Sequence, residues 1–168
     1  QGNQTHIENH RRVTKAGIVM KIKTVGINQR KRAFIVNTAK ACFHFPFSRV
    51  RLGMTPGDPI VDVTVDRELA QEAFTYTLAS GKEATIHLDE VLEYNRDAEY
   101  LLNMLLYKLT IKAQKMLTTR KLSKREIIRR LHTSPSQFYR LMDQTNHHKS
   151  IDQMIKLLAA LDCAVDVV

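Results

Sequence analysis

The stretch LSKREIIRRLHTSPSQFYRL, residues 122–141, decides the fold of the C-terminal part of this 168-residue chain. Near its start, Ser123 is followed three residues later by Glu126, which is the spacing of a capping box at a helix N-terminus. Apolar residues then recur on one face of the predicted helix, at Ile127, Ile128 and Leu131. The pattern predicts a helix of about nine residues that buries this face.

A second short helix is predicted after a turn of about three residues. Ser134 matches its N-cap, Pro135 its first helical position, and Gln137 the glutamine position of a second capping box. Phe138 and Leu141 continue its apolar side. Two short helices joined so closely must cross steeply to bury their apolar faces together. The start of the second helix is then expected to project from the body, with the positive end of its dipole outward.

Further helices are predicted on both sides of this pair. Residues 89–94 match one helical turn, and Asp97 matches the N-cap of a helix that runs to about Thr119. Apolar residues surround the front half of this long helix, so we expect it to be covered by the helical domain and by either the β domain or a second copy of the chain. Ser150 is expected to cap a last helix that reaches Leu161. The residues expected to face inward from that helix are Ile151, Met154, Ile155, Leu158 and Leu161.

Upstream of residue 89 the apolar period is two, which predicts strands. The alternating or β-branched stretches are residues 20–25, 33–36, 42–45, 60–66, 73–78 and 84–88. Residues 79–82 contain Gly81 and match a hairpin turn between the last two stretches. The predicted class is α+β, with a small antiparallel β domain over residues 20–94 and a long helix and helical domain over residues 97–168. Residues 1–19 are interpreted as a tail or an upstream remnant.

Positive charge is concentrated in blocks of the chain, whose formal net charge is +9. Residues 108–149 contain eleven Lys or Arg and two Asp or Glu, so this block alone has a net charge of +9. Residues 61–107 contain three and ten, a net of −7. A cationic block that also carries helical patterning indicates either a surface that faces a polyanion or a solvated basic face.

Residues 122–141, with residues 149–152 and 157–161, resemble the helix-turn-helix of the lambda-repressor/Cro-like family. The long helix after Asp97 corresponds to the first helix of that family, so the resemblance covers about residues 97–161 and leaves the β domain outside it. It implies a DNA-binding domain in which the third helix contacts bases, while the start of the second helix and the following loop contact phosphates. The family favours a small residue at Ile128 and glycine at His132, so His132 is expected to adopt a left-handed backbone conformation.

This resemblance assigns individual residues to DNA. Those assigned to base contacts are Ser136, Gln137, Arg140 and Pro135. Those assigned to the DNA backbone are Lys124, Arg125, Arg129, Thr133, Ser134, Tyr139, Asn146 and Lys149. Glutamine can pair bidentately with adenine and arginine with guanine in the major groove. The alternative is that these residues are ordinary exposed polar residues on a helix surface and contact no DNA.

No other chemistry is indicated by the sequence. The acidic residues between 62 and 72 have no histidine, cysteine or pocket motif beside them, so no catalytic residue is assigned. The adjacent histidines at 147–148 lack the spacing of zinc ligands on a helix, and neither a metal nor another cofactor is predicted. Two distant cysteines indicate reduced thiols, and the absence of a long apolar run predicts no membrane contact. We expect a cytoplasmic protein.

These patterns predict a transcriptional regulator that binds double-stranded DNA specifically, as a homodimer on a near-palindromic site. The long helix and the alternating residues 163–168, a predicted short strand, are the expected self-association elements. The β domain is then a sensor, dimerisation or partner module.

Two alternatives remain open. One is an antitoxin-like protein that binds a partner protein through the β domain and only secondarily autoregulates its own operon. The other is a helix-turn-helix module that only assembles complexes.

Overall fold

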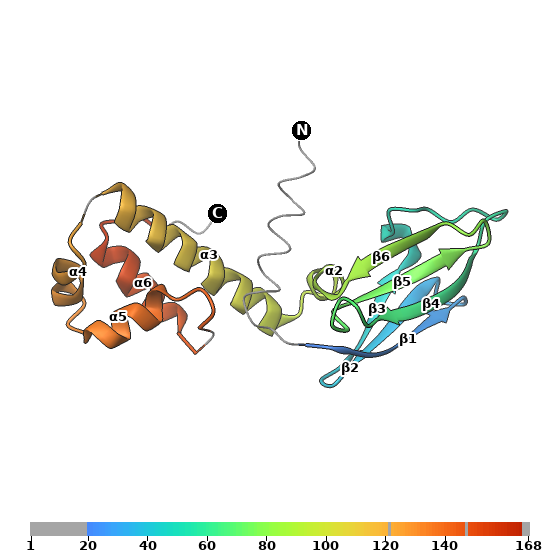
Figure 1. Ribbon diagram of the computed structural model, residues 1–168, viewed down its shortest axis with the longest axis horizontal. Coiled ribbons are helices and arrows are strands. Elements are labelled where there is room, and N and C mark those ends of the chain that lie inside the picture. The colour runs from blue at the N-terminus through green and yellow to red at the C-terminus, as the bar shows by residue number, and fades with distance from the viewer. Residues whose placement is uncertain (1–19, 121, 147, 166–168) are drawn as a thin grey trace. The chain divides into compact units, whose positions relative to one another are not determined.

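The computed structural model describes residues 20–120, 122–146 and 148–165 (Figure 1). The chain divides into two compact units, a β unit that ends at Tyr100 and a helical unit that begins at Leu101, and each is described by itself. Six strands in two sheets and five α-helices are present in the described residues, so the predicted α+β class is confirmed. The predicted tail, residues 1–19, lies outside the described residues. No described helix is both long and apolar enough to cross a membrane.

The β unit consists of two antiparallel three-stranded sheets, each in the order of the chain. The strands are β1 (Ile22–Asn28), β2 (Ala33–Thr38), β3 (Cys42–Pro46), β4 (Ile60–Asp66), β5 (Ala73–Leu78) and β6 (Glu83–His87). A short 3-10 turn, η1 (Phe47–Arg49), follows β3. Every predicted alternating stretch forms a strand, and the predicted hairpin at residues 79–82 forms with Gly81 at φ 81°.

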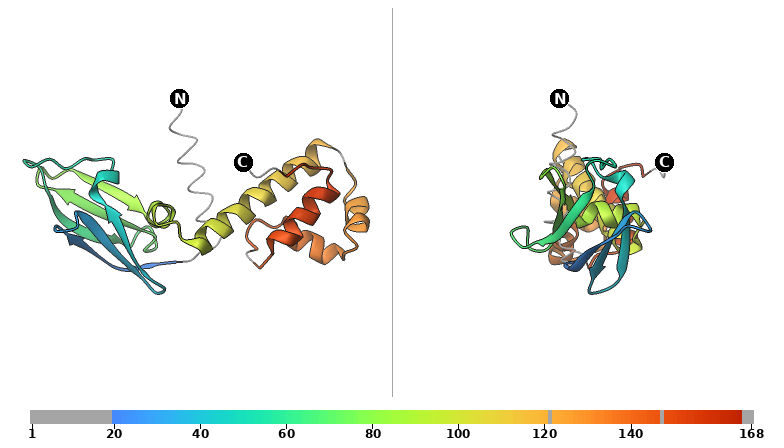
Figure 2. Two further views of the ribbon diagram at one scale, coloured as in Figure 1. Left: turned by 180° about the vertical axis from the view of Figure 1, so that it is seen from behind. Right: turned by 90° about the vertical axis from the view of Figure 1, so that its right-hand side faces the viewer.

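The two sheets repeat one arrangement. Ile22 pairs with Thr38 in the first sheet as Ile60 pairs with Leu78 in the second, and each register then shifts at the next residue. The central strands β2 and β5 have the same order of buried and half-buried residues. The two sheets lie against each other (Figure 2). The core lies between them, where the ring of Phe34 is centred 5.1 Å from that of Phe74. The β unit is therefore a sandwich of two similar meanders.

Helix α2 (Leu88–Tyr94) packs against β3 and β6. The chain then enters α3 (Ala98–Thr119), whose first turn is capped by Asp97, because its Oδ1 accepts a hydrogen bond of 2.9 Å from the backbone N–H of Tyr100. The predicted N-cap of the long helix is therefore confirmed. The division between the units falls inside this first turn of α3.

The helical unit has one core, built from all four of its helices. Besides the greater part of α3, it contains α4 (Lys124–Arg130), α5 (Pro135–Met142) and α6 (Ile151–Ala160). The buried residues are Leu106, Leu109, Ala113, Ile127, Phe138, Leu141, Met154, Leu157, Leu158 and Leu161.

Two expectations about this unit need correction. Ile151 and Ile155 are exposed, and Leu157 takes the inward position in α6, because its buried stripe lies one residue further round the helix than predicted. The predicted strand at residues 163–168 is not formed at 163–165, where Ala164 instead accepts a hydrogen bond from Lys112; residues 166–168 lie outside the described part.

Candidate nucleic-acid interface

The short helices α4 and α5 are fixed to each other by a shared core and a tight turn. Ile127 of α4 is 0% exposed and Phe138 of α5 is 1% exposed, and both belong to the single core of the helical unit. His132, in the turn, has φ 49°, the left-handed conformation expected for it. The turn leaves Ser134, Pro135 and Ser136 exposed at the surface of the unit.

The first turn of α5 is capped by its own side chains. The hydroxyl of Ser134 accepts a hydrogen bond of 3.1 Å from the backbone N–H of Gln137, and Pro135 occupies the first helical position, as predicted. The second half of the predicted capping box does not form, and the side-chain amide of Gln137 has no hydrogen-bond partner among the described residues. This amide is therefore available to an outside partner, next to the exposed Ser136.

The last carbonyl groups of α5 are capped by side chains from elsewhere in the helical unit. Hydrogen bonds run from Asn146 to the carbonyl of Arg140, from Lys149 to that of Leu141 and from Gln114 to that of Met142, at 2.9, 3.1 and 2.8 Å. Because Gln114 belongs to α3, the end of α5 is attached to that helix as well as to the following loop. Sequence reasoning missed these caps. The only local signal was the absence of a glycine after α5.

Lys149 is a structural residue and not the backbone contact that the sequence predicted. Its side chain turns inward, the residue is 6% exposed, and its ammonium donates to the hydroxyl of Thr110 at 2.7 Å. The same ammonium donates to the carbonyl oxygens of Leu141 at 3.1 Å and Asp143 at 2.6 Å. Burial lowers the pKa of Lys149 to about 8. An ammonium with three internal acceptors cannot reach a phosphate without leaving the unit's interior.

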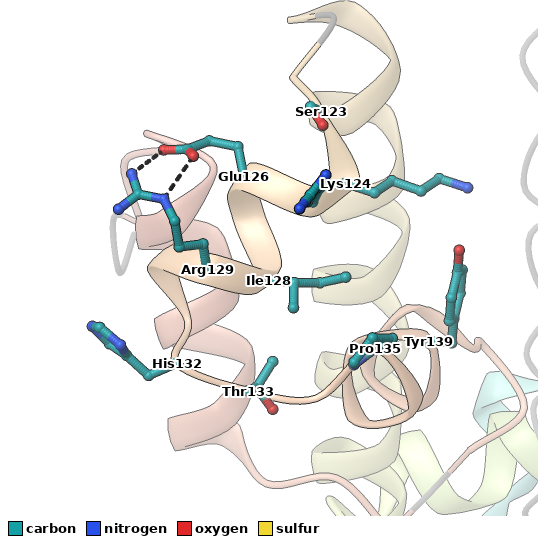
Figure 3. A pocket seen from close by; sticks show the side chains of 10 residues that line it. Ser123, Lys124, Glu126, Ile128, Arg129, His132, Thr133, Pro135 and Tyr139 are labelled. Carbon is teal, nitrogen blue, oxygen red and sulfur yellow. Dashed lines mark hydrogen bonds and ion pairs between the residues drawn. The ribbon is translucent and has the colours of Figure 1, made fainter.

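Glu126 also departs from its predicted role. The predicted capping box of α4 does not form: the hydroxyl of Ser123 accepts no cap hydrogen bond, and the carboxylate of Glu126 accepts from two arginines within one helical turn instead. It accepts from Arg129 at 2.8 and 2.9 Å (Figure 3). It also accepts from Arg130 at 3.0 Å. Charge-assisted hydrogen bonds of this kind are stronger than a bond to a neutral backbone N–H. Hydrogen bonds from the arginines lower the pKa of Glu126 to about 2.

Three exposed cations on α4 and α5 form no ion pair within the described residues. Arg125 and Arg140 are exposed, and their side chains form neither an ion pair nor a hydrogen bond within the described residues. Lys124 is exposed, and its ammonium lies 5.5 Å from the centre of the Tyr139 ring. Arg129, although paired with Glu126, keeps 75% of its side chain exposed. The structure thus brings most of the predicted DNA-contacting cations to the surface formed by α4 and α5.

The remaining predicted backbone residues have mixed placements. Thr133 is half-buried, and the hydroxyl of Ser134 is used in the cap of α5. Asn146 shapes its own loop, since its amide donates to the carbonyl of Arg140 while its Oδ1 accepts from the backbone N–H of His148 at 3.0 Å. Tyr139, by contrast, is 54% exposed.

A hollow of about 990 Å³ lies between α4 and α5 on this surface (Figure 3). Its lining consists of Ser123, Lys124, Arg125, Glu126, Ile128, Arg129, His132, Thr133, Pro135 and Tyr139. Ile128, Pro135 and Tyr139 contribute apolar surface, whereas the cations and His132 stand around them. The hollow therefore combines an apolar floor with a positive rim.

Two buried polar groups of the β unit stand out. They are Asp89, which is 8% exposed, and the hydroxyl of Tyr100, which is buried and has no partner within the described ranges. Burial, reinforced by Glu72, raises the pKa of Asp89 to about 6, and burial also raises the pKa of Tyr100. No cluster of three potential metal ligands exists in the part of the chain that the structure describes.

Comparison of the chain with protein-family models, with curated proteins and with solved structures returns no match.

Proposed function

We propose that this chain is a transcriptional regulator that binds double-stranded DNA specifically, as a homodimer on a near-palindromic site. The observation that carries the proposal is the surface at the start of α5. In its first turn, Ser136 is exposed and the side-chain amide of Gln137 has no hydrogen-bond partner among the described residues. Arg140 is exposed in the last turn of the same helix, and Lys124 and Arg125 of α4 form no ion pair within the described residues. The cytoplasmic location expected from the sequence is part of this proposal.

The proposed base contacts use the chemistry of the exposed side chains. A major groove about 12 Å wide admits one α-helix, and a helix that enters by its N-terminus presents its first turn to base edges. Gln137 can bond bidentately to adenine and Arg140 to guanine, while the Ser136 hydroxyl can donate or accept. Their order along α5, at spacings of one and three residues, keeps all three near one side of the helix.

The proposed phosphate contacts come from cations on both helices. Lys124 and Arg125 extend from α4, and each phosphate that a cation neutralises releases counterions from the DNA. Binding is therefore expected to weaken steeply with salt, with a slope of about −0.9 in log K against log salt for every phosphate contacted.

Exposed leucines on α3 support the proposed self-association. Leu101, Leu102 and Leu105 are 42–43% exposed in the helical unit, which is unusual for three large aliphatic side chains so close together. A two-fold pairing through such a surface places two copies of α5 in opposite directions, as a near-palindromic site requires. Leu105→Lys should therefore give a monomer in sedimentation analysis that binds the full site more weakly than the parent chain.

The experiment that tests the proposal is selection of bound sequences from random double-stranded DNA with the full chain, followed by titration at several salt concentrations. We expect an enriched motif with dyad symmetry, and Gln137→Ala and Arg140→Ala should each cost ~1–3 kcal/mol of discrimination at one base pair. Lys156→Ala is the matched control, because Lys156 is an exposed cation on α6 that pairs only with Asp152. Absence of any enriched motif, or equal discrimination by all three variants, would contradict the proposal.

A further inference from the structure

We propose that the apolar floor of the hollow between α4 and α5, formed by Ile128, Pro135 and Tyr139, contacts the C5-methyl group of a thymine in the major groove. This inference rests on the proposed DNA binding and adds specificity residues to it. Ile128 has no assigned role in DNA contact, and Tyr139 has been assigned only to the DNA backbone.

The first argument is the distribution of chemistry within the hollow. A phosphate needs hydrogen-bond donors, yet Ile128 offers an aliphatic side chain and Pro135 has no backbone N–H. The floor is therefore unsuited to an anion, while Lys124 and Arg125 at the rim suit one well. The hollow therefore suits a partner that presents an apolar group between anions. The major groove at a thymine has this arrangement, because the apolar C5-methyl group lies between the two phosphate backbones.

The second argument is the fixed position of Tyr139. Its ring is 54% exposed, yet it is held from two sides in the helical unit. The ring of Phe138, itself buried, meets it edge-on at 5.5 Å between centres. The ammonium of Lys124, drawn with Tyr139 in Figure 3, lies 5.5 Å from the centre of the ring. An aromatic ring fixed in this way loses little conformational entropy when it contacts a base.

The third argument is continuity with the proposed base-reading residues. Pro135 directly precedes Ser136, and Tyr139 directly precedes Arg140. Pro135 and Tyr139 are four residues apart, so they are neighbours on the surface of α5, and Ile128 lines the hollow from α4. A base pair next to those read by Ser136 and Arg140 is then the one that meets the floor.

The test removes single methyl groups from the DNA and leaves the protein unchanged. Each thymine of the selected site is replaced in turn by deoxyuridine, which lacks only the C5-methyl. At one position in each half-site we expect the affinity of the parent chain to fall about 3- to 5-fold, as expected for exposing one methyl-sized apolar group. Thymines elsewhere in the site should show no change.

Variants then assign the effect to the floor. In Ile128→Ala and in Tyr139→Ala the difference between thymine and deoxyuridine should shrink to less than about 2-fold, since the contact is lost from the protein side. Tyr139→Phe, which keeps the ring, should retain the difference. Arg125→Ala, which removes a cation of the hollow that forms no ion pair within the described residues, should weaken binding to the thymine and deoxyuridine sites equally. Circular dichroism of each variant checks folding, and the parent-chain measurement stands even where a variant does not fold.

The outcomes separate this inference from the proposed function. Specific, salt-dependent binding with no methyl effect at any thymine would overturn the inference and leave DNA recognition standing. A methyl effect of unchanged size in both alanine variants would also overturn it, as would failure of the chain to bind DNA at all, which removes the proposed function too.

Discussion

Burial of Lys149 should make the stability of the helical unit rise at alkaline pH. The pKa of this lysine is lowered from 10.5 to about 8 in the folded chain, mainly because burial disfavours the charged form. Between these two pKa values the unfolded state binds more protons than the folded state, so the free energy of unfolding increases with pH. This increase in the free energy of unfolding begins near pH 8 and is complete near pH 10.5.

The size of the effect follows from the same two values. A pKa unit corresponds to about 1.4 kcal/mol, so the full contribution reaches about 3 kcal/mol, of which about 2 kcal/mol develops between about pH 7 and about pH 9.5. Lys149→Met keeps a side chain of similar length but cannot titrate. The difference in unfolding free energy between the parent chain and Lys149→Met should therefore change by about 2 kcal/mol over this range, in favour of the parent chain.

Urea unfolding of both proteins at the two pH values measures this difference. Taking the difference between proteins cancels the titration of other groups, such as the buried tyrosines Tyr76 and Tyr100. Lys156→Met serves as the control, because it makes the same substitution at an exposed lysine of α6. If parent and Lys149→Met differ by the same free energy at both pH values, the ammonium of Lys149 is not destabilised by burial and the reasoning fails.

Three further predictions follow from single groups. Asp89→Asn should stabilise the chain at neutral pH, because a buried carboxyl whose pKa is raised to about 6 loses stability as pH rises through that value. In urea unfolding, the free energy of unfolding of Asp89→Asn relative to the parent chain should increase by about 1 kcal/mol from about pH 5 to about pH 7.5. A difference between the two proteins that does not change with pH would contradict this prediction. Glu126→Gln should tighten DNA binding and steepen its salt dependence, because Arg129 is then free for a phosphate, whereas unchanged binding in salt titrations would exclude that role. His132→Gly should raise unfolding free energy by about 1 kcal/mol, since glycine adopts φ 49° without strain, and a decrease would mean that the imidazole makes a stabilising contact.

Local patterns predicted the elements of this chain well because they depend on near neighbours. Period-two alternation placed all six strands, and the boundary residue Asp97 placed the start of α3. The repetition of the two meanders was not visible in the sequence, because only burial and register are repeated. Residues 20–53 contain eight Lys or Arg and no Asp or Glu, whereas residues 54–97 contain three and ten. Charge at exposed positions is free to differ while the buried pattern stays the same.

The errors at the candidate site have a common physical cause, which is competition from partners that the local rule ignores. Glu126 satisfied the spacing of a capping box, but Arg129 and Arg130 stand within one turn of it and offer charged donors. Lys149 lies in a polar stretch where exposure is the ordinary expectation for a lysine. Its acceptor Thr110 is 39 residues away in the chain, so no window of local sequence could place the two together.

The caps at the end of α5 bear directly on how that helix could read DNA. A glycine after the helix would satisfy the last carbonyls within α5 itself and leave its tilt against α3 to apolar packing alone. Here the side chain of Gln114, on α3, donates to the carbonyl of Met142. The ammonium of Lys149 joins the carbonyl of Leu141 to the hydroxyl of Thr110, which is also on α3. A change in the tilt of α5 would therefore break directional hydrogen bonds. Base contacts depend on side-chain positions within a fraction of an ångström, and a buried lysine that costs stability at neutral pH is consistent with a requirement for fixed tilt. On this reasoning, Lys149→Met should weaken discrimination between sites more than it weakens nonspecific binding, even at a pH where its unfolding free energy matches that of the parent chain.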